Sequence, residues 1–429
     1  MKFENTLAFA QEMDQKDPLK SYKDQYFMPI SASTQKEAIY FTGNSLGLQP
    51  KGAKAALEVE LEDWAKLGVE GHFDGRNPWF HYHKFFTEKA AKLVGAKPTE
   101  VVMMNNLTVN LHLLMVSFYR PSKSRFKILI EKGAFPSDQY AVASQARLHG
   151  YDPNEAVVEL CPREGEHSLR QEDIIATINE HGDQLALVMM PGVQYYTGQV
   201  FDIPTITAAG HSVGAFVGWD LAHAAGNISL ALHDSGADFA TWCTYKYLNS
   251  GPGSVSGVFV HEKHSGKSDI PRFEGWWGYD EEKRFQMEKG FVPMEGAGAW
   301  QLSNAPVFNM AIHKVALDLF DEAGMPALRA KSDLLTAYLS DLLMRQLDES
   351  GQPAFEIITP TDPKHRGAQL SILSLKYGKE LFDYLTENGV ITDWRNPNVI
   401  RVAPVPMYNS FEDVYHLARL ISEYSSVKK

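Results

Sequence analysis

Apolar residues along the chain fall into short continuous runs and into segments with helical spacing. Between about residues 100 and 260 the two kinds of pattern alternate, which predicts buried strands that alternate with helices. The predicted strands are 127–130, 185–190, 215–219 and 239–243, and the predicted helices are 107–118 and 203–213. This order favours a largely parallel sheet flanked by helices, which is an α/β fold.

The remaining chain is less regular and suggests three parts. Residues 261–305 are irregular and rich in Gly and Trp, whereas the chain after 305 becomes helical and then alternates short strands with helices. We therefore expect residues 76–305 to form a large domain and residues 306–429 to form a smaller C-terminal α/β domain. Residues 1–75 would be an arm and loop segment that contributes to the small domain and the active site.

Composition narrows the classes of partner and compartment. Hydrophobic residues make up 44% of the 429 residues and charged residues 22%, as in an ordinary globular protein. The net charge of -12 argues against a nucleic-acid partner. No apolar run is long enough to cross a membrane, and the polar N-terminus resembles no targeting signal, so we expect a cytoplasmic protein. The two cysteines form neither a disulfide framework nor a metal site, and no metal is predicted.

Two chemically reactive side chains follow neighbouring predicted strands. Asp220 follows the strand 215–219, and Lys246 follows the strand 239–243, between two tyrosines and before a glycine-rich loop. Burial lowers the pKa of a lysine and makes its amine nucleophilic. A lysine and an aspartate at strand ends are what pyridoxal phosphate (PLP) requires, for covalent attachment and for a protonated ring nitrogen. The alternatives are an exposed lysine tip and a helix-capping aspartate.

Several further candidates lie where ligands collect in such sheets. The carboxyl ends of parallel strands meet along one edge, and Phe135, Tyr195, Asp220 and Lys246 all follow predicted strands. Thr108 lies at the start of a predicted helix, where it either caps the helix or helps to bind a phosphate. The convergence of these residues predicts a ligand site at this edge of the sheet.

Seven longer stretches resemble the kynureninase family, within the fold type I (aminotransferase-like) PLP-dependent enzymes. The resemblance extends from about Tyr40 to the last predicted helix. The stretches are GNSLGLQP (43–50), LTVNLHLLM (107–115), AFPSD (134–138), YYTGQ (195–199), DLAHAAGN (220–227), CTYKYLN (243–249) and RNPNVIRVAPVPMYNSF (395–411). The resemblance implies a fold type I architecture and hydrolytic Cβ–Cγ cleavage of L-kynurenine or 3-hydroxy-L-kynurenine, in tryptophan catabolism or NAD biosynthesis.

The resemblance also implies roles for individual residues. Lys246 would carry PLP as a Schiff base and remove the Cα proton, Asp220 would pair with the ring nitrogen, and Tyr245 would act as an acid–base relay. The implied cofactor-binding residues are Leu107, Thr108, Phe135, Ser137, Asp138, Asp220, His223, Tyr245, Lys246, Trp276 and Asn304. The implied active sites lie at a homodimer interface, with Trp276 and Asn304 as candidates for contributions from the partner subunit.

On the substrate side, the resemblance makes Arg401 the clamp for the amino-acid carboxylate. Ser45, His72 and Asn304 would surround the aryl ketone; without the resemblance, a surface ion pair and loop hydrogen bonds explain these residues. Pro191 is a departure, because some relatives carry a serine there and proline offers neither a hydroxyl nor an N–H.

Three other functions remain open at this stage. An aminotransferase of the same fold would need the Lys246 and Asp220 pair but not the stretches at 43–50 and 395–411. A cysteine desulfurase would need a mobile nucleophilic cysteine, and both cysteines lie in or beside apolar strands. A binding protein without catalysis predicts the loss of Lys246 or Asp220, and both are present.

Overall fold

The computed structural model describes residues 2–267, 269–347 and 351–427, and it divides into two compact units. The large unit comprises residues 52–193 and 201–321. The small unit comprises residues 1–51, 194–200 and 322–429. Among the described helices, none is both long enough and apolar enough to pass through a lipid bilayer.

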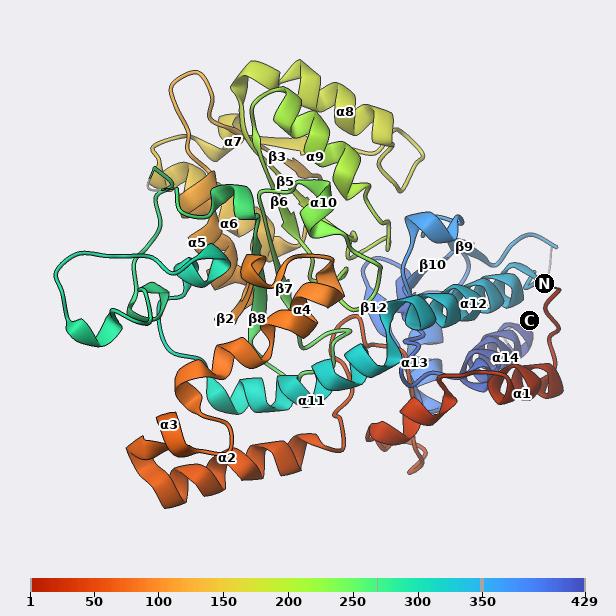
Figure 1. The fold of residues 1–429 in the computed structure, drawn as a ribbon. Coiled ribbons are helices and arrows are strands. Elements are labelled where there is room, and N and C mark those ends of the chain that lie inside the picture. Colours follow the sequence, from red (N-terminus) through yellow and green to blue (C-terminus); the bar gives the residue numbers. More distant parts are fainter. Residues whose placement is uncertain (1, 268, 348–350, 428–429) are drawn as a thin grey trace. The chain divides into compact units, whose positions relative to one another are not determined.

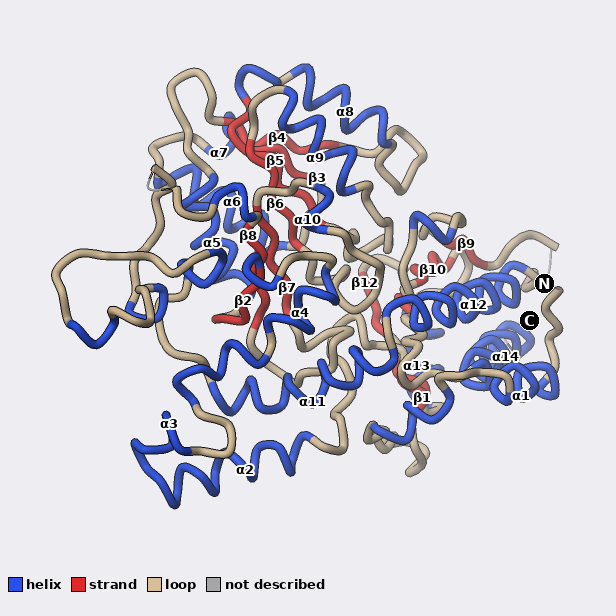
Figure 2. Tube along the Cα trace, viewed as in Figure 1, coloured by secondary structure: helices blue, strands red, loops and turns tan. Residues whose placement is uncertain are grey.

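A seven-stranded sheet forms the centre of the large unit, with the strand order β2-β8-β7-β6-β5-β3-β4 (Figures 1 and 2). The strands are β2 (Val101–Met104), β3 (Lys127–Glu131), β4 (Val157–Leu160), β5 (Leu185–Pro191), β6 (Phe216–Asp220), β7 (Phe239–Cys243) and β8 (Ser256–Val260). Strands β4, β3, β5, β6 and β7 pair in parallel, and β8 runs antiparallel to both β7 and β2. The predicted mostly parallel sheet is therefore confirmed.

Helices cover both faces of this sheet. The helices of the large unit are α2 (Ala53–Leu67), α3 (Gly71–Asp74), α4 (Thr87–Val94), α5 (Leu107–Phe118), α6 (Pro136–Leu148), α7 (Pro153–Ala156), α8 (Gln171–Glu180), α9 (Ile203–Ser212), α10 (Leu232–Ser235) and α11 (Val307–Ala323). Apolar residues of α5 and α6 pack on one face. On the other face, α9 approaches β6 closely, because a Cβ on Gly210 would lie 2.5 Å from Val217.

The small unit has its own core and two small sheets. The four-stranded antiparallel sheet has the order β12-β13-β10-β9, and β1 pairs in parallel with β11. The strands are β1 (Ile39–Tyr40), β9 (Phe355–Ile357), β10 (Leu370–Ser374), β11 (Val390–Ile391), β12 (Asp393–Arg395) and β13 (Val399–Val402). The helices α1 (Leu7–Gln15), α12 (Met325–Met344), α13 (Lys379–Glu387) and α14 (Phe411–Val427) bury a shared apolar cluster against these strands.

The chain passes from one compact unit to the other at 51/52 and at 321/322, whereas the domain boundaries predicted from the sequence are 75/76 and 305/306. Side-chain packing explains the difference. The ring of Trp64 in α2 lies 5.9 Å from the ring of Phe308 in α11, and Lys89 in α4 pairs with Asp318 in α11 at 2.6 Å. These contacts join α2 and most of α11 to the large unit. They could not be predicted from a local change in amino-acid composition.

Candidate active site

The amine of Lys246 lies in the large unit, three residues after β7, and is buried. Its Nζ atom is 3.0 Å from Nε2 of His223, which lies in the turn that follows β6. The Nζ atom also lies 5.6 Å from the ring centroid of Phe135 and 5.9 Å from that of Tyr245. The structure therefore places three of the predicted residues, His223, Phe135 and Tyr245, around the Lys246 amine.

Asp220 is the last residue of β6, and its carboxylate is fixed at the same edge of the sheet. Its Oδ1 accepts the N–H of Ala222 at 2.7 Å, and the side chain shares a hydrogen bond with Asp138 in the first turn of α6. Burial, and then repulsion from Asp220, raise the pKa of Asp138 well above its usual value. Burial also raises the pKa of Asp220, against the opposing effects of the Ala222 N–H and the charge of Lys246. Burial therefore favours the protonated form of both carboxyl groups beside Lys246.

Glu131, the last residue of β3, adds a third buried carboxyl group that the sequence did not single out. Burial, together with repulsion from Asp220, raises the pKa of Glu131 to about 8. The sequence could have indicated Glu131 as a site residue, because it lies at the carboxyl end of β3, which runs parallel to β5 and β6. We missed it because a single acidic residue at a strand end usually faces solvent.

Tyr245 lies next to Lys246, and burial raises the pKa of its phenol, with a further contribution from the neighbouring Cys243. The phenol is therefore protonated at neutral pH and can donate a proton. Burial likewise raises the pKa of the Cys243 thiol. A buried, protonated thiol is a poor nucleophile, so Cys243 has the properties of a structural residue.

The start of α5 presents free backbone N–H groups, as a phosphate site requires. Asn106 is the N-cap residue, but its side chain makes no capping bond and instead donates to the carbonyl of Gly253 at 3.3 Å. The first turn, which contains Leu107 and Thr108, is therefore not closed by its own cap. A cavity of about 180 Å³ adjoins this end, and its lining includes Asn105, Asn106, Gly253 and Asn304.

Other predicted residues of the large unit lie in more exposed positions. Trp276 is 44% exposed and packs edge-on against Phe285. Ser137 lies beside Asp138, with its hydroxyl 3.5 Å from that carboxylate. His72 lies in α3, where its Nδ1 is 3.0 Å from the carbonyl of Val69. Pro191 is the register partner of Asp220 in the β5–β6 ladder, so the departure from the family pattern lies directly beside the key carboxylate.

Arg401 lies in β13 of the small unit, and only 1% of its side chain is exposed. Its guanidinium pairs with Asp393 of β12 and donates to the carbonyl of Tyr195 at 2.7 Å. Arg401 is therefore not the surface ion pair that we considered as an alternative. One guanidinium nitrogen is held by Asp393 and another by the Tyr195 carbonyl, so the orientation of the planar group is fixed.

Ser45 is exposed and lies in a loop of the small unit. The neighbouring residue Asn44, which the sequence did not single out, is buried and supports this loop. The amide of Asn44 is fully buried and donates to Oε1 of Gln369 at 2.7 Å. Gln369 in turn donates to the carbonyl of Tyr195 at 3.0 Å. The guanidinium of Arg401 donates to the same carbonyl, so one hydrogen-bonded network fixes both the Ser45 loop and the arginine.

Comparison with known proteins gives a consistent result. Residues 328–421 match the family model described as the kynureninase C-terminal domain. Kynureninases from Flavobacterium johnsoniae and Myxococcus xanthus are each 56% identical, covering 99% of this chain and 99% and 98% of theirs. A kynureninase from Nematostella vectensis is 49% identical over 96% of this chain and 93% of its own.

Solved structures with the same fold are more distant in sequence. A cysteine desulfurase from Thermococcus onnurineus has a TM-score of 0.73 at 16% identity, over 91% of this chain and 95% of its own. The desulfurase CsdA from Escherichia coli has a TM-score of 0.74 at 15% identity, over 95% and 98%. These likenesses confirm the predicted fold type I architecture. The near-full-length relatives confirm the resemblance found in the sequence, and the chain belongs to the kynureninase family.

Proposed function

We propose that the protein is a PLP-dependent hydrolase that cleaves L-kynurenine, or its 3-hydroxy derivative, to anthranilate or 3-hydroxyanthranilate and L-alanine. The observation that carries this proposal is the buried Lys246 amine beside His223, with Asp220 at the next strand end, in a chain of this family. A role in tryptophan catabolism or NAD biosynthesis and a cytoplasmic location remain parts of the proposal.

The residues present fit PLP. Phe135 offers a ring face near the amine, the fixed carboxyl group of Asp220 suits a pyridinium partner, and the uncapped start of α5 suits a phosphate. When bound, PLP supplies an electron sink for the negative charge that develops on the substrate carbons. Lys246 would hold its aldehyde carbon, and Leu107, Thr108, Tyr245 and Trp276 would hold its phosphate.

Proton transfer falls to residues already described. The Lys246 amine would take the proton from the substrate α-carbon. The Tyr245 phenol, whose pKa is raised by burial, would be a proton donor for the later steps. The fixed carboxyl group of Asp220 would be the partner of the cofactor's ring nitrogen.

The residues proposed for substrate recognition are those that the family resemblance implied. Arg401 would bind the substrate carboxylate through its planar guanidinium. Ser45, His72 and Asn304 would surround the aryl ketone. The network of Asn44 and Gln369 supports this assignment, because a fixed loop and a fixed guanidinium cost less entropy on binding.

A homodimer with shared active sites is part of the proposal. Large apolar side chains are exposed on α2, on α3 and in the segments that follow them, namely Leu61, Trp64, Val69, Phe73 and Phe85. An exposed group of this kind supports a protein interface. Trp276 and Asn304 are also exposed, as expected of residues that reach a partner's site.

The deciding experiment is incubation of the PLP-loaded protein with L-kynurenine, with anthranilate followed by its fluorescence and L-alanine measured separately. We expect both products in equal amounts, none from Lys246→Ala, and normal turnover from the exposed-lysine control Lys267→Ala. Formation of sulfide from L-cysteine, without anthranilate from L-kynurenine, would favour a desulfurase instead. A shifted cofactor spectrum without anthranilate would point to a different amino-acid substrate.

A further inference from the structure

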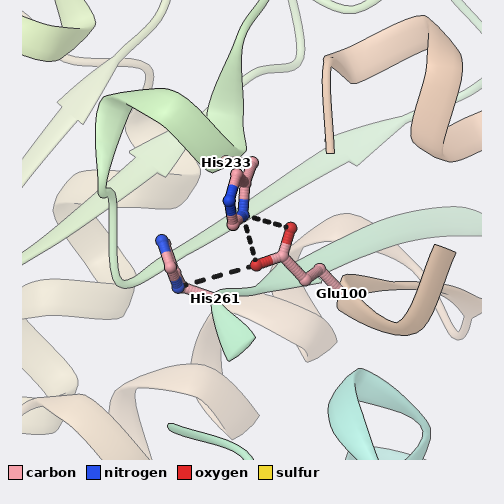
Figure 3. A group of neighbouring side chains, drawn as sticks. All are labelled: Glu100, His233 and His261. Carbon is pink, nitrogen blue, oxygen red and sulfur yellow. Dashed lines mark hydrogen bonds and ion pairs between the residues drawn. The ribbon is translucent and has the colours of Figure 1, made fainter. Parts of the chain in front are cut away.

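A second polar cluster of the large unit gathers three potential metal ligands. Glu100 directly precedes β2, His233 lies in α10, and His261 directly follows β8 (Figure 3). Nδ1 of His233 lies 3.0 and 3.1 Å from the two Glu100 oxygens, and Nδ1 of His261 lies 3.5 Å from Oε1. All three ligand atoms lie within 4.8 Å of one another.

The cluster lies at the opposite edge of the sheet from the candidate active site. Glu100 precedes the first residue of β2 and His261 follows the last residue of antiparallel β8, so both mark the amino ends of the parallel strands. Lys246 and Asp220 mark the carboxyl ends. The cluster is therefore separate from the chemistry proposed above.

The carboxylate of Glu100 is rigidly held and fully buried. Its Oε1 accepts the N–H of Glu262 at 2.8 Å, and its Oε2 accepts the N–H of Lys97 at 2.9 Å. Backbone donors thus fix both oxygens, and on the side that faces the histidines both oxygens contact Nδ1 of His233, whose hydrogen an ion would replace. The two histidines are partly exposed, at 27% for His233 and 13% for His261, so an ion can reach the cluster from solvent.

The proton arrangement leaves two acceptors facing each other. Nδ1 of His261 accepts the N–H of Lys263 at 3.1 Å, so it carries no hydrogen of its own. Oε1 of Glu100 is likewise an acceptor and lies 3.5 Å away. A cation bound by Nδ1 would take the lone pair that accepts the Lys263 N–H, and it would replace the repulsion between Nδ1 and Oε1 with attraction.

We propose that Glu100, His233 and His261 bind a divalent transition-metal ion of the Zn²⁺ type, with water as the fourth ligand. Two histidines and one glutamate are an established Zn²⁺ ligand set, with ligand distances of about 2.0–2.2 Å. Tetrahedral ligands at that distance lie about 3.4 Å apart, so a small rotation of the imidazoles closes the set. On binding, His233 ligates through Nδ1 and carries its proton on Nε2.

The ion would have a structural role. It would connect the segment before β2, the helix that leads into β7, and the end of β8, and these three strands are neighbours in the sheet. Zn²⁺ binding should therefore raise the melting temperature without changing turnover. The rival interpretation is a hydrogen-bonded cluster that binds no metal.

The test is equilibrium dialysis of the chelator-washed holoenzyme against Zn²⁺, with bound metal counted by mass spectrometry. We expect one Zn²⁺ per chain. Loss of a partner that only orients a ligand already weakens metal sites about 10–100-fold, so His233→Ala and His261→Gln should weaken binding by roughly 100-fold or more. The glutamine in His261→Gln can still accept the Lys263 N–H, which protects the fold.

The control is His365→Ala, which removes an exposed histidine of the small unit and should leave Zn²⁺ binding unchanged. Retained PLP absorbance verifies that each variant is folded. The proposal is overturned if the wild type binds no Zn²⁺, or if His233→Ala and His261→Gln bind as tightly as the wild type. Neither result depends on turnover of kynurenine, so failure of the proposed function would be seen separately.

Discussion

The Nζ atom of Lys246 lies 3.0 Å from Nε2 of His223, and the two residues follow adjacent parallel strands. Which of the two nitrogens donates depends on the tautomer of the imidazole. This contact holds the amine in place near the ring of Phe135.

Replacing His223 should weaken cofactor retention. His223→Phe keeps an aromatic ring but removes the nitrogen that contacts the Lys246 amine, and a hydrogen bond contributes about 0.5–1.5 kcal/mol. We expect the dissociation constant for PLP to rise roughly 2- to 10-fold, measured by absorbance after dialysis against increasing PLP. An unchanged constant would mean that the contact is incidental to cofactor binding.

Replacing Tyr245 should separate cofactor binding from turnover. Tyr245→Phe removes the phenolic proton but keeps the ring that lies near Lys246. General acid–base catalysis contributes typically about 10²–10⁴-fold, so kcat should fall by that order while the PLP absorbance stays. Full activity in this variant would rule out Tyr245 as the proton relay.

Replacing Glu131 should change how stability depends on pH. Its pKa rises from an ordinary 4.5 to about 8 on folding, because the group is buried and faces Asp220. Below about pH 4.5 both states are protonated; above it the unfolded chain ionises first, so the folded state loses stability until about pH 8. The amide in Glu131→Gln does not ionise, so this variant does not lose folding stability in this way as the pH rises.

The melting temperatures of wild type and Glu131→Gln should therefore be similar near pH 4.5 and diverge as the pH rises. The variant should become the more stable protein, by an amount on the order of a few kcal/mol at pH 8. Parallel melting curves across this range would show that Glu131 ionises normally in the folded state.

The sequence predicted the features that local pattern determines. Apolar runs gave β3, β5, β6 and β7 to within a residue or two at each end, and the ends of these strands gave Asp220 and Lys246. It did not give the strands β2, β4 and β8. All three are only four or five residues long, and β2 and β8 lie beside loops with stronger turn signals.

Features that depend on tertiary contacts were beyond local pattern. Glu131 acquires its properties only because folding buries it beside Asp220. Asn44 supports the loop that contains Ser45 through a hydrogen bond to Gln369, a residue far away in the sequence. Glu100, His233 and His261 meet only when β2 pairs with β8, so no spacing rule could connect them.

Replacing Arg401 with lysine should impair substrate binding more than cofactor binding. Lysine keeps the positive charge but cannot contact Asp393, the Tyr195 carbonyl and a carboxylate with one planar group. We expect KM for kynurenine to rise roughly 10- to 100-fold with an unchanged PLP spectrum. Loss of PLP binding instead would indicate that the buried Arg401–Asp393 pair mainly maintains the fold.

Mixing Lys246→Ala with Asn304→Ala tests whether Asn304 serves its own subunit or the partner in the proposed homodimer. Asn304 shares a cavity with Asn105 and Asn106 of its own chain, beside the start of α5, so an effect within one subunit is a real alternative. In a mixed dimer of Lys246→Ala and Asn304→Ala, a shared site combines the intact Lys246 of one chain with the intact Asn304 of the other.

If Asn304 reaches across the interface, unfolding and refolding the two variants together should restore roughly a quarter of wild-type activity, because half the dimers are mixed and each has one complete site. If Asn304 acts within its own subunit, every site with Lys246 lacks Asn304 and no activity returns. Wild type refolded with Lys246→Ala controls for the recovery of dimers. The result decides between the two arrangements because each predicts a different activity from the same mixture.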